Sequence, residues 1–317
     1  MKKKILIISH NYDVFSSKSN RQHITWVHDC CKDYEIDGWG PAGPKEHQFS
    51  SGPYGVPNLK SLMRKIDSFK PDFIYLTLRR RYDSWLPDMS SIKSIPKIFV
   101  EVDNLFYNRN DDWYDQFTHL YCRQPWWDKK LIHATDKDRK SDEFKLVMSN
   151  VKTWKNVPHF KWSIPESRID ILKTLGKVKR VGAFFVGRLH HKRNFYLARQ
   201  SMAKRFKGKV DFVEAKGPAY WDMLYGAESL VCPAEHRFGG YVPQKLFEYV
   251  CSGARVFTNC DLERYGIKDV SDIVVRYNDW DQLDSFLEKS DSPDIEKIID
   301  VMSEHTHRKR YEEIFVG

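Results

Sequence analysis

The 317-residue chain lacks the long apolar runs of membrane spans, since none approaches the ~20 residues that cross a bilayer. Its first residues, Met1-Lys2-Lys3-Lys4, are basic, but the apolar stretch at 5–8 is too short for the core of a signal peptide. The chain also has neither a repeat of fixed period nor a low-complexity tract. These features predict an ordered globular protein with no transmembrane segment and no secretory signal.

Residue patterns typical of metal sites are also missing. The six cysteines have no metal-ligand spacing, and several lie in apolar contexts where a reduced thiol packs as a small hydrophobe. The acidic pair Asp111-Asp112 lies in a polar segment typical of a solvated loop. We therefore predict no metal site, and reduced cysteines favour a cytoplasmic location.

Positive charge is in excess. Lysine and arginine number 52 against 43 acidic residues, which gives a formal net charge of +9. Such a balance predicts an anionic partner, either nucleic acid, a phosphorylated glycan or lipid, or an acidic membrane surface.

The chain reads as an α/β protein of two domains. Single hydrophobic cores stop growing at about 250–300 residues, and this chain has 317. Short apolar runs alternate with helical segments, a pattern typical of βαβ units and doubly wound parallel sheets. The expected strands are 5–9, 73–77, 97–102, 120–122, 183–186, 210–214, 230–232, 254–258 and 273–277, with helices over about 20–33 and 295–315.

Prolines and charges over about 160–177 predict an interdomain linker. The expected domains are therefore residues 1–163 and 164–317. Each should be Rossmann-like, since both halves show the same alternation.

The most informative stretch is 229–258, which reads as a β-loop-α-β unit. A buried strand at 230–232 is followed by a polar loop at 235–241 and a helix that opens near Pro243. Gly253 should end that helix before the next strand. Backbone N–H groups of the loop should therefore lie next to the helix N-terminus, where the macrodipole favours an anion such as a diphosphate. The residues expected to present these groups are Gly239, Gly240, Tyr241 and Val242.

A carboxylate on the same helix suits a nucleotide. Glu248 lies five residues before Gly253, where it can accept both hydroxyls of a ribose. The alternative is an exposed helical carboxylate, because charged helix residues are usually solvated. A nucleotide site is the simpler interpretation, since ligands of open α/β sheets bind at the carboxyl ends of the strands.

Two blocks of the second half carry a family resemblance. Residues 242–253 read Val-Pro-Gln-Lys-Leu-Phe-Glu-Tyr-Val-Cys-Ser-Gly, and residues 184–194 read Phe-Phe-Val-Gly-Arg-Leu-His-His-Lys-Arg-Asn. The first block resembles the donor-site signature Pro-x-Lys-x-x-Glu-Tyr-x-x-x-Gly of group-1 glycosyltransferases with the GT-B fold. The second is similar to that family's strand ending in Gly-Arg-Leu, with a cation a few residues later.

This resemblance implies two Rossmann-like domains facing a central cleft and a UDP- or GDP-linked sugar as donor, with no other cofactor. In the family a C-terminal helix crosses back to the first domain, and the tail at 295–315 is the candidate for that helix. Arg188 and a later cation, Lys192 or Arg193, should hold the diphosphate, with Lys245 as a further candidate. These cations would stabilise the leaving group without a metal. A turn with a solvated cation is the alternative for Arg188.

One position departs from the family pattern. Many members carry a glutamate eight positions before the one that corresponds to Glu248, and here that position is Gly240. The missing glutamate normally contacts the sugar, so the sugar and the stereochemical outcome stay open, although the resemblance implies retention.

The acceptor should bind to loops of the first half. Asp103 follows the strand at 97–102 and either binds a sugar hydroxyl, acts as a base, or makes an ordinary turn. His10 follows the first strand and either faces the cleft or is packed or solvated. Arg79-Arg80-Arg81 also follows a strand and is either a solvated loop or a contact for a phosphorylated acceptor.

With this resemblance, the sequence predicts a glycosyltransferase with an unidentified acceptor, and the resemblance implies that the reaction is metal-independent and retaining. One alternative is a glycosyltransferase that acts on bases in DNA, favoured by the basic balance. The other is a GT-B protein that binds a nucleotide or glycan and has lost catalysis, favoured by the missing glutamate.

Overall fold

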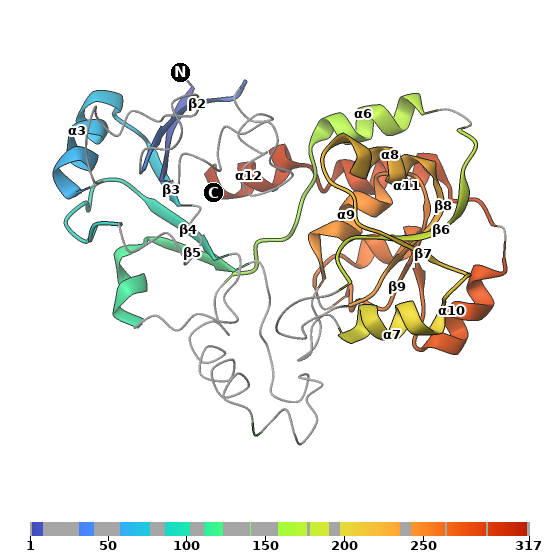
Figure 1. Cartoon of the computed structure of the whole chain (residues 1–317). Helices are drawn as coiled ribbons and strands as arrows, with labels where there is room; N and C mark the ends of the chain where they lie inside the picture. The colour runs from blue at the N-terminus through green and yellow to red at the C-terminus, as the bar shows by residue number, and fades with distance from the viewer. Residues whose placement is uncertain are drawn as a thin grey trace. The chain divides into compact units, whose positions relative to one another are not determined.

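The computed structural model of the chain contains two parallel β-sheets of five strands each, which belong to separate compact units (Figure 1). The first unit is drawn from residues 1–127, 140–160 and 310–317, and the second from 128–139 and 161–309. The predicted α/β class is thereby confirmed. The structure describes residues 2–8, 32–40, 58–76, 86–101, 111–122, 140, 158–175, 178–189, 197–234, 242–263, 265–289 and 291–315.

The first unit is built on a sheet with the order β2-β1-β3-β4-β5. Its strands are β1 (Lys3–Ile8), β2 (Tyr34–Trp39), β3 (Phe73–Leu76), β4 (Lys97–Glu101) and β5 (His119–Cys122). Helix α3 (Leu59–Phe69) begins with a capping box in which the Asn58 side chain accepts from the backbone N–H of Ser61. A short 3-10 helix (Asp111–Gln116) precedes β5.

The chain's last helix contributes to the core of this unit. Helix α12 (His307–Phe315) inserts Tyr311, Ile314 and Phe315 among buried residues of β1, β3 and β4. The hydroxyls of Tyr75 and Tyr311 lie 3.2 Å apart in this core. The boundary between the two units falls within α12, after residue 309.

Strand β2 was not predicted from the sequence. Its residues, Tyr34-Glu35-Ile36-Asp37-Gly38-Trp39, combine charges with a glycine, and such a stretch has weak strand propensity. It forms because it pairs in parallel with β1 at the edge of the sheet and buries Tyr34 and Trp39. Of the helix expected over 20–33, residues 20–31 lie outside the described residues, and 32 and 33 form a turn.

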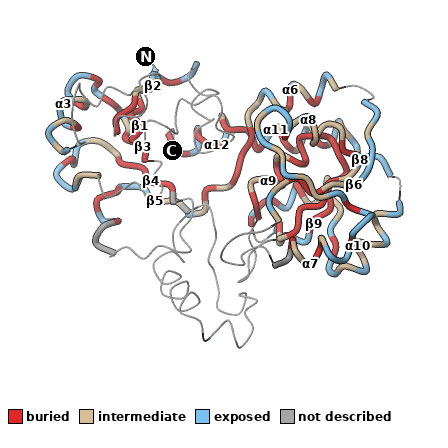
Figure 2. The backbone as a smooth tube through the Cα atoms, viewed as in Figure 1, coloured by how far each residue is buried: buried red, intermediate tan, exposed pale blue. Residues whose placement is uncertain are grey.

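The second unit has a sheet with the order β10-β9-β8-β6-β7, all in parallel. Its strands are β6 (Val181–Val186), β7 (Asp211–Val213), β8 (Ala227–Cys232), β9 (Arg255–Thr258) and β10 (Val275–Arg276). Its other helices are α6 (Glu166–Thr174), α7 (Leu197–Arg205), α8 (Pro218–Gly226), α9 (Gln244–Val250), α10 (Trp280–Leu287) and α11 (Ile295–Ser303). In Figure 2 the buried segments of each unit follow its central strands.

Two parts of the second unit differ from the prediction. The segment expected as a linker over 160–177 contains helix α6, which packs against α11 and buries Ile169 and Leu172. The strand expected at 273–277 is only the two-residue β10, preceded by a 3-10 helix (Lys268–Ile273). In both places tertiary contacts outweigh the local pattern.

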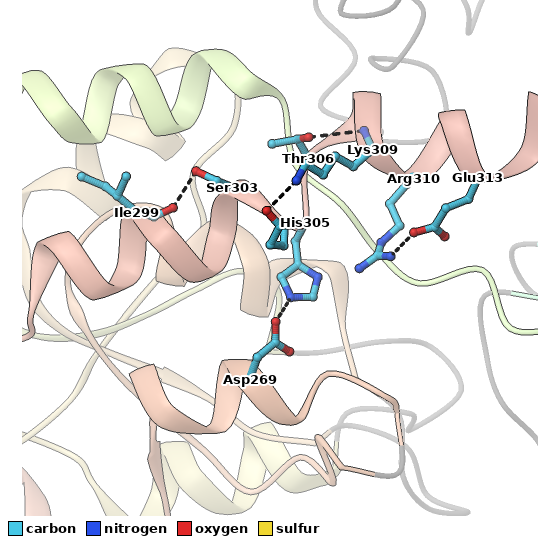
Figure 3. A network of polar contacts seen from close by, with 9 residues as sticks. Asp269, Ile299, Ser303, His305, Thr306, Lys309, Arg310 and Glu313 are labelled. Atoms are coloured by element: carbon cyan, nitrogen blue, oxygen red, sulfur yellow. Dashed lines mark hydrogen bonds and ion pairs between the residues drawn. The ribbon is translucent and has the colours of Figure 1, made fainter. Parts of the chain in front are cut away.

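The tail at 295–315 forms two helices rather than one. Between α11 and α12, the carbonyl of His305 accepts from the Ile164 N–H, and the Ile164 carbonyl accepts from His307. The His305 ring also hydrogen-bonds Asp269 at 2.7 Å (Figure 3). The His305 carbonyl and the His307 N–H, which would form helical hydrogen bonds in a continuous helix, are thus bonded to Ile164, and the helix is interrupted there.

No helix among the described residues combines the length and apolar character required to cross a membrane.

Candidate functional site

The candidate site lies in the second unit, at the edge where the parallel strands end. Because β6, β7 and β8 run in parallel, the residues that follow them meet at this edge. Helix α9 begins there after Pro243, whose extended φ of −73° and missing N–H suit a helix start. The helix ends before Gly253, which has the positive φ of 71° expected of a helix stop.

Tyr249 joins the two sequence blocks that carry the family resemblance. From α9, its hydroxyl bonds the backbone N–H and the carbonyl of Val186 at the end of β6, at 2.9 Å each. Burial raises the pKa of Tyr249 well above its ordinary value, so the phenol stays protonated. The Gly-Arg-Leu block and the Pro-x-Lys-x-x-Glu block are therefore neighbours in space.

Gly187 and Lys245 are in close contact within this pair of blocks. Gly187 has a φ of 151°, and a Cβ atom at this position would overlap with the Lys245 Nζ. Only glycine lacks that atom and adopts this backbone conformation without strain. The glycine of the first block thus makes room for the lysine of the second.

The Lys245 ammonium lies near an aromatic ring and feels the charge of another cation, Arg199. Its Nζ is 4.9 Å from the centroid of the Phe185 ring. Burial, followed by the positive charge of Arg199, lowers the pKa of Lys245 to about 8. In the described part of the chain this ammonium has no hydrogen-bond or ion-pair partner. A cation in such surroundings favours an anionic ligand.

Arg188 is the second cation of the site. Its Nε forms an exposed ion pair with Glu214, just after β7, at 3.1 Å. Arg199 of α7 is buried and donates to the carbonyl of Arg188 at 2.6 Å, which fixes the backbone of the turn. Exposed ion pairs are worth little, so an anion can take the place of Glu214 at low energetic cost.

Glu248 is held by two side chains. The Tyr220 hydroxyl donates to its Oε2 at 2.5 Å, and the Gln244 side-chain amide donates to its Oε1 at 2.9 Å. Burial raises the pKa of Glu248, while these hydrogen bonds and the charge of Lys245 oppose that rise. The carboxylate is partly buried rather than solvated, unlike an ordinary helical glutamate.

The remaining predicted residues are placed as follows. Val242 is buried, and its carbonyl accepts from the Trp162 indole N–H at 3.0 Å. The other candidates lie outside the described residues and stay predictions, namely His10, Asp103, Lys192, Arg193, Gly240 and Tyr241. The described residues contain no group of three or more potential metal ligands.

Sequence reasoning missed several residues of the site, among them Arg199, Glu214, Tyr220 and Gln244. Glu214 could have been found, because it is the last residue of the strand predicted over 210–214, and that strand ends at the ligand-binding edge. Arg199 and Tyr220 lie on helices between strands, and nothing in the local pattern shows which way they point.

The cysteines of this unit within the described residues are free and buried, as expected of reduced thiols. Burial raises the pKa of Cys232 to about 12, so its thiol is uncharged and unreactive at neutral pH.

No protein-family model matches the chain, and no curated protein matches it in sequence. Solved structures, however, share its fold over nearly the whole length. An α-glucosyltransferase in complex with UDP and a 13-mer DNA containing an HMU base has a TM-score of 0.56 at 9% identity, with all of both chains covered. AviGT4, a glycosyltransferase involved in avilamycin A biosynthesis, has a TM-score of 0.54 at 12% identity, covering 99% of this chain and 97% of its own.

A glycosyltransferase from Rickettsia africae has a TM-score of 0.54 at 11% identity, with 99% of this chain and 98% of that chain covered. Likeness at such low identity is a likeness of fold. The chain has the two-domain GT-B fold that the sequence predicts.

Proposed function

We propose that this protein is a glycosyltransferase that takes its sugar from a nucleotide-sugar held by the second unit. The observation that carries the proposal is the Lys245 ammonium, which lies against Gly187 at the end of β6 with Arg188 next in the chain. Both cations belong to the edge where the parallel strands end, and open α/β sheets bind their ligands at such an edge. A diphosphate matches such a site in charge.

The chemistry follows from the charges of the site. When the glycosidic bond to the nucleotide breaks, negative charge develops on the leaving diphosphate, and Lys245 and Arg188 stabilise it. Lys192, Arg193 and the N–H groups of 240–242 complete the predicted contacts. Cations in this number make a metal unnecessary, so we propose a metal-independent reaction. Glu248 would hold the ribose of the same nucleotide.

The acceptor side and the stereochemistry are proposed on the resemblance to the family. Asp103 and His10 are the candidate acceptor-side residues, and the sugar is expected to keep its anomeric configuration.

Replacing Arg188 by alanine is expected to weaken binding of the nucleotide-sugar about tenfold or more, because a charge-assisted contact to phosphate is lost. A first thermal-shift screen of UDP, GDP and their sugars would identify the ligand, since binding to the native state raises Tm. Calorimetry and donor hydrolysis would then compare the variant with the wild type.

Arg205→Ala is the matched control for this experiment. Arg205 is also an exposed arginine paired with a carboxylate, that of Asp281. It lies at the end of α7, and its ion-pair partner among the described residues belongs to α10 rather than to the candidate site. Unchanged binding and turnover in Arg188→Ala, or an equal loss in both variants, would remove the proposed donor site.

Transfer to a base in DNA is a second candidate function. Two observations favour it: the net charge of +9 and the fold shared, over all of both chains, with a glucosyltransferase solved with DNA. It predicts duplex binding whose affinity falls about 10³-fold or more between 50 and 200 mM salt, as for proteins with 6–10 phosphate contacts. Fluorescence anisotropy with a labelled duplex measures this, and absence of binding at low salt would eliminate the candidate.

A further inference from the structure

The Glu248 carboxylate is bonded by two different elements. Tyr220 belongs to α8, and its hydroxyl reaches Oε2 at 2.5 Å; Gln244, in the first turn of α9, reaches Oε1 at 2.9 Å. Each carboxylate oxygen therefore receives one protein donor. Two fixed donors hold the carboxylate in one orientation, because any rotation breaks at least one hydrogen bond.

The direction of the Tyr220 hydrogen bond is settled by its surroundings. Tyr220 is 7% exposed, and burial, together with the charge of Glu248, raises the pKa of its phenol well above the ordinary value. The phenol is therefore protonated at every physiological pH and donates to the carboxylate. This hydrogen bond favours the ionised form of Glu248 against the effect of burial.

The two bonded oxygens retain capacity for a ligand. An ionised carboxylate offers about four acceptor positions, and the two protein donors use one on each oxygen. What remains is a pair of adjacent acceptors in a fixed plane. Two adjacent hydroxyls on one sugar ring match such a pair, whereas a single hydroxyl uses only half of it.

We propose that Tyr220 and Gln244 are positioning residues that orient Glu248 to accept the 2′- and 3′-hydroxyls of a ribonucleotide, and so set a preference for ribo- over 2′-deoxyribonucleotides. The inference rests on the proposed function, because the nucleotide is the leaving group of the donor. It extends that function by assigning selectivity for the pentose to a three-residue cluster that spans α8 and α9.

The experiment measures Kd by calorimetry for UDP, GDP and their 2′-deoxy analogues, with pyrophosphate as a ligand that lacks the pentose. The variants are Tyr220→Phe and Gln244→Leu, each of which removes one donor, and Glu248→Gln, which replaces the carboxylate itself. Tyr225→Phe is the matched control, because Tyr225 lies on the same helix and its hydroxyl accepts from Arg168 instead of contacting Glu248.

In the wild type, the better of the two ribonucleotides should bind about 10- to 100-fold more tightly than its 2′-deoxy analogue, the value of one hydrogen bond to a charged group. Tyr220→Phe and Gln244→Leu should each reduce that ratio about threefold or more, with pyrophosphate binding unchanged. Loss of the Tyr220 hydrogen bond should raise the pKa of Glu248 further. As pH is lowered, Tyr220→Phe should therefore lose its preference for the ribonucleotide at a higher pH than the wild type does. Tyr225→Phe should retain the wild-type ratio.

Two outcomes overturn the inference in distinguishable ways. In the first, Glu248→Gln changes the ratio of ribonucleotide to 2′-deoxyribonucleotide affinity, but Tyr220→Phe and Gln244→Leu keep the wild-type ratio. The positioning role is then wrong, and the donor site stands. If the wild type binds neither UDP nor GDP, the proposed function fails and the inference fails with it. A changed ratio also excludes a purely structural role for Tyr220 and Gln244, because a loss of stability would weaken the binding of both nucleotides equally.

Discussion

Lys245→Met is expected to stabilise the protein and to abolish most of its activity. Burial and the charge of Arg199 lower the pKa of Lys245 from 10.5 to about 8. The charged lysine therefore destabilises the folded state at neutral pH. Removing that charge should raise the free energy of unfolding by about 1–3 kcal/mol, since one pKa unit corresponds to about 1.4 kcal/mol. Methionine also fills the space beside Phe185 with a flexible apolar chain.

The same change should reduce kcat/KM about 10²- to 10³-fold, the usual effect of losing one preorganised group that stabilises a leaving anion. Denaturant unfolding and donor hydrolysis measure the two effects on one preparation. Lys268→Met is the control, because Lys268 is a surface lysine with an 82% exposed side chain. Its replacement should change stability by less than about 0.5 kcal/mol and leave turnover intact. A less stable Lys245→Met with normal turnover would contradict the assignment.

The pH dependence of the Lys245 effect has a defined sign. Because the folded-state pKa is the lower one, the cost in stability is fully present below pH 8 and disappears as pH rises toward 10.5. The stability difference between Lys245→Met and the wild type should shrink over that window. A bound diphosphate raises the pKa again, so wild-type affinity for a nucleotide-sugar should fall above about pH 8, while the affinity of Lys245→Met stays level.

Gly187→Ala is expected to weaken donor binding with only a moderate loss of stability. The new Cβ would overlap with the Lys245 Nζ, which is the free end of a flexible side chain and can move away. The backbone at φ 151° is strained for alanine, and such strain costs about 1–3 kcal/mol. Once displaced, Lys245 no longer stabilises the diphosphate, so affinity should fall about tenfold or more.

Gly208→Ala separates the two effects. Gly208 also has a positive φ, 84°, but a Cβ there has no neighbour within 4 Å. It should lose about 1–2 kcal/mol of stability from the backbone alone and keep full affinity. Calorimetry and thermal unfolding of both variants test the prediction. Equal affinities in the two alanine variants would show that the contact with Lys245 has no role in binding.

Local chemistry was enough to predict the elements around the site. The sequence indicated the end of β8 near Cys232, the start of α9 after Pro243 and the turn at Gly253, and all three are confirmed. Proline at a helix start and glycine at a helix stop act through their own backbone, so neighbours along the chain suffice to identify them. The resemblance of the two blocks added the GT-B fold.

The contacts between elements could not be predicted in the same way. Strand β2 is held by its pairing with β1, and α6 by its packing against α11, so neither has a strong local signal. Glu214 meets Arg188 because β7 pairs with β6, and Tyr220 meets Glu248 across 28 positions of sequence. Such pairs depend on sheet order and on the direction in which each helix points its side chains.

By itself, the sequence determined which residue types stand at the ends of strands and at the start of α9, because turns, caps and periodicity are properties of neighbouring residues. Tertiary structure alone decided that Lys245 lies against Gly187 with its charge partly desolvated, and that Tyr220 bonds Glu248. The reason is physical: a pKa and a hydrogen bond depend on distance through space, and folding sets that distance independently of separation along the chain.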